Sequence, residues 1–116
     1  MTLKAYQNTQ RITENPRESE YRLFGQVTGA LISAKREKRS GGPLAEAVDW
    51  NRKIWRTLAA DCLDDRNKLP EGVRASIVSL SLFVTRYSKE VMRQGASLDP
   101  LIEINRLIMQ GLQGAA

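Results

Sequence analysis

Apolar residues recur along this chain at the 3.6-residue spacing of an amphipathic helix, and proline or glycine interrupts each repeat. The first clear repeat runs from Pro16 into the charged residues 35–39 and stops at Ser40-Gly41-Gly42. Its apolar face consists of Leu23, Phe24, Val27, Leu31 and Ala34. Asn15 can cap the free N–H groups at the start and Pro16 suits the first turn, so the pattern predicts a helix that begins here.

Three further repeats follow in the same manner. One starts at Pro43 and ends near residues 64–67, a second runs from Pro70 to about Gly95, and a third starts at Asp99-Pro100 and continues toward the C-terminus. The second of these has the most regular stripe, which is made of Val73, Ile77, Leu80, Val84, Tyr87 and Val91. In the last repeat, Asp99 is the expected cap residue and Pro100 the first residue of the helix.

These repeats predict an all-α protein, a small single-domain bundle of four to five helices that spans residues 1–116. The fifth helix would be a short one in residues 2–14, with Leu3 and Tyr6 facing inward. No segment shows the alternation of apolar and polar residues that is typical of a strand. Gly25 and Gly29, four residues apart, suggest a place where two helices pack closely.

The residue types that catalysis needs are scarce. The chain has no histidine, which removes the usual general base and the commonest metal ligand. Its one cysteine, Cys62, lies in an apolar helix stripe, where we expect a buried packing residue. Asp61, Asp64 and Asp65 are interpreted as a solvated helix end, because a hard-cation site needs more oxygen ligands. We therefore expect no enzyme activity, no cofactor and no metal.

Charge and hydropathy bear on location and on partners. The net charge is +5, and the excess lies in residues 1–58, which carry eleven Lys and Arg against six Asp and Glu. A single cysteine cannot form an internal disulfide, which suits a reducing compartment. No apolar run approaches the ~20 residues that a membrane span needs. The N-terminus also lacks the apolar stretch of a secretory signal, so we expect a cytoplasmic protein.

The helix that follows Pro70 carries apolar residues outside its main stripe. Val78 and Leu82 point roughly away from that stripe, and Arg86 and Lys89 continue the same side. Two interpretations follow. Either this helix is central and has neighbours on both sides, or Val78 and Leu82 form an exposed strip with a basic end, on which an amphipathic helix of a partner could dock.

Two tryptophans and two asparagines lie in or near apolar stripes. Trp55 shares the stripe of its helix and should be in the core, whereas Trp50 lies at the edge and is a candidate partner-binding residue. Asn105 falls within the apolar arc of the last helix, and Asn51 poses the same question in its own helix. A buried amide must be hydrogen-bonded, so we favour a structural bond to a neighbouring helix over a contact with a ligand.

The densest basic cluster is formed by Lys35, Arg36, Lys38 and Arg39. Cations at the C-terminal end of a helix suit its dipole, so a solvated helix end is the simplest interpretation. The alternative is a contact with RNA or with an acidic protein. The lack of aromatic residues within the cluster does not favour RNA.

Several segments resemble a known family when they are taken in order. They are residues 15–24 (NPRESEYRLF), residues 50–55 (WNRKIW), Leu69-Pro70 and residues 100–105 (PLIEIN). This series resembles the flagellar biosynthesis regulator FlaF of alphaproteobacteria, and the likeness spans nearly the whole chain.

The resemblance implies a flagellar function. FlaF-like proteins are needed for making and exporting flagellin, and they are thought to bind flagellin in the manner of a secretion chaperone. They act together with FlbT, a second regulator, which restrains flagellin translation through its mRNA. Flagellin is therefore the expected partner, and the alternative is post-transcriptional regulation of flagellin mRNA, either directly or through FlbT. No residue-level binding site is carried over from the resemblance.

Overall fold

The computed structural model describes residues 16–114, which form four helices and, within that range, no strand. The helices are α2 (Pro16–Arg36), α3 (Gly41–Leu63), α4 (Glu71–Gln94) and α5 (Asp99–Gly114). The prediction of a small all-α bundle is confirmed. The short helix expected in residues 2–14 lies outside the described residues.

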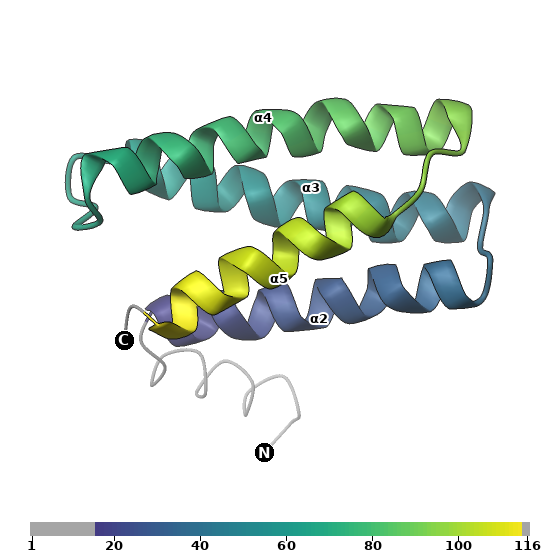
Figure 1. Ribbon diagram of the computed structural model, residues 1–116, viewed down its shortest axis with the longest axis horizontal. Coiled ribbons are helices and arrows are strands. Elements are labelled where there is room, and N and C mark those ends of the chain that lie inside the picture. The colour runs from purple at the N-terminus through teal and green to yellow at the C-terminus, as the bar shows by residue number, and fades with distance from the viewer. Residues whose placement is uncertain (1–15, 115–116) are drawn as a thin grey trace, which may run out of the picture.

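The helices are arranged with α3 between α2 and α4, and α5 crosses one face of this layer from the end of α4 toward the start of α2 (Figure 1). The main packing pairs are α3 with α4, α2 with α5, and α2 with α3. Helix α4 therefore lies at an edge and packs mainly on α3. The alternative in which α4 is central, with neighbours on both sides, is wrong.

The helix starts agree with the predicted ones to within two residues. Helix α2 begins at Pro16, as predicted. Helix α3 begins at Gly41, two residues before Pro43, because Pro43 still fits in the first turn, where its missing N–H needs no partner. Asp99 was expected to be the cap residue that precedes α5. It is instead the first residue of that helix and lies in its first turn.

Two helices end in the left-handed backbone conformation that closes a final turn. Gly95 follows α4 with a φ of 67°, and its N–H donates to the Val91 carbonyl at 3.2 Å. Glycine adopts this conformation without strain, which explains why the predicted end is confirmed. After α2, Lys38 takes the same role with a φ of 51°. The N–H of Arg39 donates to the Ala34 carbonyl at 2.9 Å.

The core is centred on an aromatic pair. The rings of Phe24 on α2 and Trp55 on α3 meet edge to face at 5.3 Å between centroids, and both side chains are fully buried. Cys62 is also buried, as expected. Val73 contradicts its predicted place in the stripe of α4: it lies in the first turn and is 45% exposed. The remaining large buried side chains include Leu31, Leu101, Val27, Val84 and Val91.

A buried polar network joins α3 to α5. The indole N–H of Trp55 donates to Asn105 Oδ1 at 2.8 Å, and Asn105 Nδ2 donates to Asn51 Oδ1 at 2.7 Å. Asn51 and Asn105 are both fully buried. The preference for a structural bond to a neighbouring helix is therefore confirmed. Gly29, in contrast, does not mark close packing, because a Cβ added there would meet no atom within 4 Å among the described residues.

Candidate functional site

The outer side of α4 exposes part of the predicted docking strip. Leu82 is 62% exposed, and Arg86 and Lys89 are also exposed. Val78 differs from this expectation, because it is half-buried and packs against the core. The strip thus contains one prominent apolar side chain, Leu82, with basic residues beside it.

Trp50 lies apart from this strip. Its side chain is 39% exposed and lines a pocket of about 280 Å³ between α2 and α3, together with Leu23 and Ile54. Lys89 instead lines a pocket between α3 and α4. The predicted partner-binding residues therefore do not form one patch, because Trp50 and Lys89 lie on different flanks of α3.

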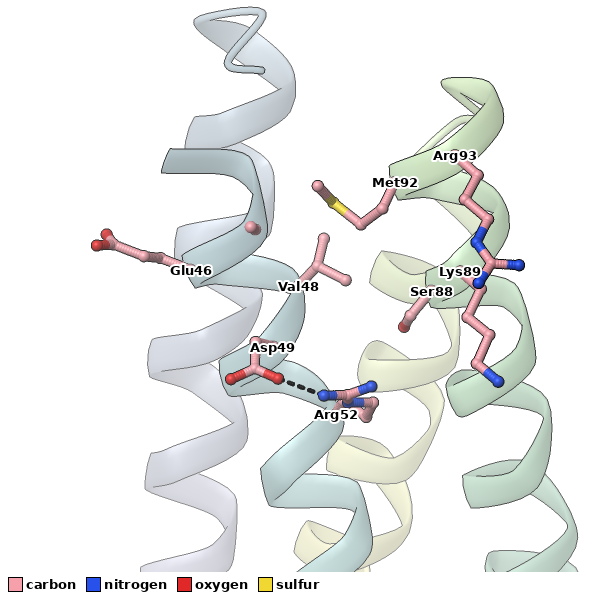
Figure 2. Close-up of a pocket in the computed structure, with 9 residues that line it drawn as sticks. Glu46, Val48, Asp49, Arg52, Ser88, Lys89, Met92 and Arg93 are labelled. Carbon is pink, nitrogen blue, oxygen red and sulfur yellow. Dashed lines mark hydrogen bonds and ion pairs between the residues drawn. The ribbon is translucent and has the colours of Figure 1, made fainter. Parts of the chain in front are cut away.

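The pocket between α3 and α4, here called the α3–α4 pocket, has a volume of about 440 Å³. Figure 2 shows Met92 pointing from α4 toward α3, and Val48 pointing from α3 toward α4. The basic residues Lys89 and Arg93 extend from α4 on one side. The residues that line the pocket are Ala45, Glu46, Val48, Asp49, Arg52, Ser88, Lys89, Met92 and Arg93.

An ion-pair group borders this pocket on α3. The Arg52 guanidinium contacts Asp49 at 2.6 Å, and Lys53 Nζ contacts the other carboxylate oxygen of Asp49 at 3.1 Å. The hydrogen bond from Lys53, then that from Arg52, lowers the pKa of Asp49 below its usual value. Asp49 therefore holds the Arg52 side chain in place at the pocket.

Two buried polar atoms of the pocket residues have no hydrogen-bond partner within the described part of the chain. They are Ser88 Oγ and Arg52 Nε. Ser88 is 4% exposed, so its hydroxyl has lost water without gaining a protein partner. Such a group costs free energy, and it marks a place where a ligand can supply the missing bond. These two residues were missed from the sequence, although a serine between Val84 and Val91 in the buried row of α4 was a signal for one of them.

The basic cluster at the end of α2 is partly neutralised. Lys35 Nζ lies 2.6 Å from Asp99 Oδ1 at the start of α5, and the Arg39 guanidinium lies 2.6 Å from Glu37. Arg36 and Lys38 are exposed. Two of the four cations therefore serve local or interhelical ion pairs, and the cluster is less available to an external anion than its sequence suggests.

The acidic residues near the end of α3 and the cysteine have structural surroundings. Asp64 binds the Arg66 guanidinium at 2.8 Å, and this bond lowers the pKa of Asp64. Burial raises the pKa of the Cys62 thiol, which keeps it protonated. Within residues 16–114, no three Asp, Glu, Cys or His side chains gather as a metal site would require. Nor does any of the four helices have the length and hydropathy of a membrane span.

Comparison with known proteins places the chain in a family. No curated protein and no solved structure matches it significantly. The family model for flagellar protein FlaF matches residues 2–112, which include α2, α3, α4 and nearly all of α5. The match covers far more than half of the chain and agrees with the resemblance noted in the sequence. The chain belongs to the FlaF family of flagellar proteins.

Proposed function

We propose that this protein binds flagellin as a cytoplasmic secretion chaperone and so couples flagellin synthesis and export to filament assembly. Membership of the FlaF family supports a flagellar function. The observation that carries the proposal of binding is the outer side of α4, where Leu82 is 62% exposed beside basic residues. An edge helix with an exposed leucine offers an amphipathic helical segment an apolar contact, and the adjacent cations favour a segment that carries acidic residues.

The packing of α4 favours this role over a purely structural one. Because α4 packs mainly on α3, covering its outer side would not require the bundle to open. A flagellin segment that orders on binding would lose conformational entropy, which keeps the affinity moderate and allows release for export.

Direct binding of flagellin mRNA receives less support. Its candidate site was the cluster of Lys35, Arg36, Lys38 and Arg39, and two of these cations are already paired with Asp99 and Glu37. Regulation through FlbT stays a prediction, since FlbT could use the same exposed surfaces as flagellin.

The test is the binding of the full chain to a flagellin encoded in the same genome, measured by calorimetry and size-exclusion chromatography. We expect a 1:1 complex that Leu82→Asp weakens by about tenfold or more, because a carboxylate replaces a buried apolar contact in the complex. Circular dichroism should show unchanged helix content, since Leu82 is exposed in the free protein.

Leu107→Asp is the matched control, because Leu107 is 65% exposed on α5 and the substitution is the same. It should leave binding unchanged. Val78→Asp is a poorer probe than Leu82→Asp, because Val78 packs against the core and a charge there would destabilise the fold. Absence of a flagellin complex with the folded wild-type chain would refute the proposal.

A further inference from the structure

We propose that the α3–α4 pocket binds a carboxylate next to an aliphatic side chain, supplied by an acidic residue of a partner's helical segment. The identification of that partner as flagellin rests on the proposed function. The donors of the pocket, its charge and its apolar lining each support the binding of such a group.

The pocket offers two hydrogen-bond donors. Ser88 Oγ and Arg52 Nε are buried, lie in residues that line one pocket, and lack partners within residues 16–114. A hydroxyl and a guanidinium N–H can both donate to a carboxylate, whose two oxygens accept several hydrogen bonds. A hydrogen bond from a charged donor to a carboxylate is stronger than one between neutral groups. A carboxylate is thus an acceptor that suits either of these donors.

The charge of the pocket favours an anionic group. Three basic residues line it, Arg52, Lys89 and Arg93, against two acidic residues, Glu46 and Asp49. Figure 2 shows the Glu46 side chain directed away from the space between the helices. The lining has an excess of one positive charge when Glu46 is counted and of two when it is left out, so the pocket attracts an anionic group.

The rest of the lining is apolar and explains why the carboxylate should belong to a peptide. Met92, Val48 and Ala45 form the apolar part. A methionine adapts its shape to different aliphatic side chains, which suits a polypeptide-binding surface. A volume of about 440 Å³ exceeds what an acetate-sized ion fills and lies within the range of peptide or ligand pockets. On a helix, an aliphatic residue and an acidic residue three or four positions apart would enter together.

The first experiment reverses the charge at the pocket. The Lys89→Glu/Arg93→Glu double variant should weaken flagellin binding about tenfold or more, with a smaller dependence on salt than the wild type. The control is Lys68→Glu/Arg106→Glu, which changes the net charge equally at exposed positions outside the pocket. Equal affinities of the two double variants would overturn the proposal while leaving flagellin binding itself established.

The second experiment removes the hydroxyl alone. Ser88→Ala should weaken flagellin binding about fivefold, because one hydrogen bond is lost from the complex. In the free protein the same change should not lower the midpoint of thermal unfolding, since the hydroxyl has no partner there. Weaker binding without loss of stability would show that the hydroxyl acts in the complex and has no merely structural role. Unchanged affinity would contradict the proposal.

The third experiment separates the pocket from the identity of its partner. The full ¹⁵N-labelled chain is titrated with 4-methylpentanoate, an aliphatic carboxylate, and with the neutral 4-methylpentanamide as control. Saturable NMR shifts at Ser88, Lys89 and Val48 with the acid alone would support carboxylate binding in the pocket, even if flagellin does not bind. In that case the absence of flagellin binding would refute only the proposed function. If flagellin does not bind, equal responses to the acid and the amide, or shifts at residues outside the pocket, would refute the proposal that the pocket binds a carboxylate.

Discussion

The two flanks of α3 are built differently. On the side that meets α2 and α5, Phe24 and Trp55 pack edge to face, and two hydrogen bonds join Trp55, Asn105 and Asn51, although Asn51 Nδ2 has no partner within residues 16–114. On the side that meets α4, a pocket of about 440 Å³ remains between the helices, and Ser88 Oγ lacks a partner in the described chain. Hydrogen bonds between buried side chains of different helices stabilise a fold, whereas a buried hydroxyl without a partner leaves free energy that a ligand can recover.

This difference suggests that one side of the bundle mainly stabilises the fold and the other mainly binds a partner. The α2–α3–α5 side supplies stability and fixes the relative positions of the helices. The α4 side then presents a surface whose contacts are completed by another molecule. Substitutions on the two sides should therefore have opposite profiles, with large effects on stability on one side and large effects on binding on the other.

The largest contrast should come from side-chain truncation. Trp55→Ala removes a fully buried indole and leaves Asn105 Oδ1 without its donor, so the free energy of unfolding should fall by about 3–5 kcal/mol. That is a large fraction of the stability of a small domain. Leu82→Ala on α4 should change it by less than about 0.5 kcal/mol. Urea unfolding followed by circular dichroism measures both.

Trp50→Ala serves as the control for loss of a tryptophan in the same helix. Its side chain is 39% exposed, so the loss of stability should be clearly smaller than for Trp55→Ala. Comparable destabilisation by Trp55→Ala and Leu82→Ala would show that the two sides do not differ as described.

The second contrast concerns buried polar groups. Asn105→Ala leaves the Trp55 indole N–H and Asn51 Oδ1 unpaired, and it should destabilise the protein by about 1–3 kcal/mol. Ser88→Ala should instead be neutral or stabilise it by up to about 1 kcal/mol, because it removes an unsatisfied hydroxyl and raises helix propensity. Opposite signs in thermal unfolding support the comparison.

A double variant tests whether the amide network acts as a unit. Because Asn51 and Asn105 share a hydrogen bond, Asn51→Ala/Asn105→Ala should cost less than the sum of the two single variants. Strict additivity would mean that the bond contributes little to holding α5 on α3.

Much of the fold could be predicted from the sequence, because the signals are local. Pro16 fits only the start of a helix, and Gly95 supplies the left-handed residue that ends one. The bonding of Asn105 was also predictable, since an amide within an apolar arc has to find a partner. The beginning of α3 was placed two residues late because a proline is equally acceptable at several positions of a first turn.

The candidate site was harder to predict because it depends on tertiary packing. Periodicity shows that α4 has apolar residues on more than one side, but not whether a neighbour covers them. The place of α4 at the edge, the half-burial of Val78 and the pocket beside Val48 all follow from which helices pair. An unsatisfied hydroxyl such as that of Ser88 is visible only once the surrounding atoms are in place.

The smallest expected effect concerns two aspartates, Asp99 and Asp49, whose ion pairs differ in what they connect. Lys35 on α2 contacts Asp99 on α5 at 2.6 Å, and the hydrogen bond from Lys35 is the main cause that lowers the pKa of Asp99 below 3.8. A carboxyl whose pKa is lower in the folded than in the unfolded state stabilises the protein fully when the pH is above its unfolded-state pKa. This stabilisation is lost as the pH falls through the folded-state pKa. Asp99→Asn should therefore slightly lower the unfolding temperature near neutral pH, and this difference should vanish in acid.

Asp49→Asn is the matched control, because Asp49 also has a lowered pKa but both of its partners, Arg52 and Lys53, lie on α3. Its effect on unfolding should likewise disappear in acid, because its lowered pKa has the same sign. Only Asp99→Asn, however, should speed amide hydrogen exchange in the first turn of α5, since only that pair ties one helix to another. Because Lys35 and Asp99 are about half-exposed, added salt should reduce the effect. A difference that persists in acid, or equal exchange in the two variants, would show that the Lys35–Asp99 pair does not help to hold α5 in place.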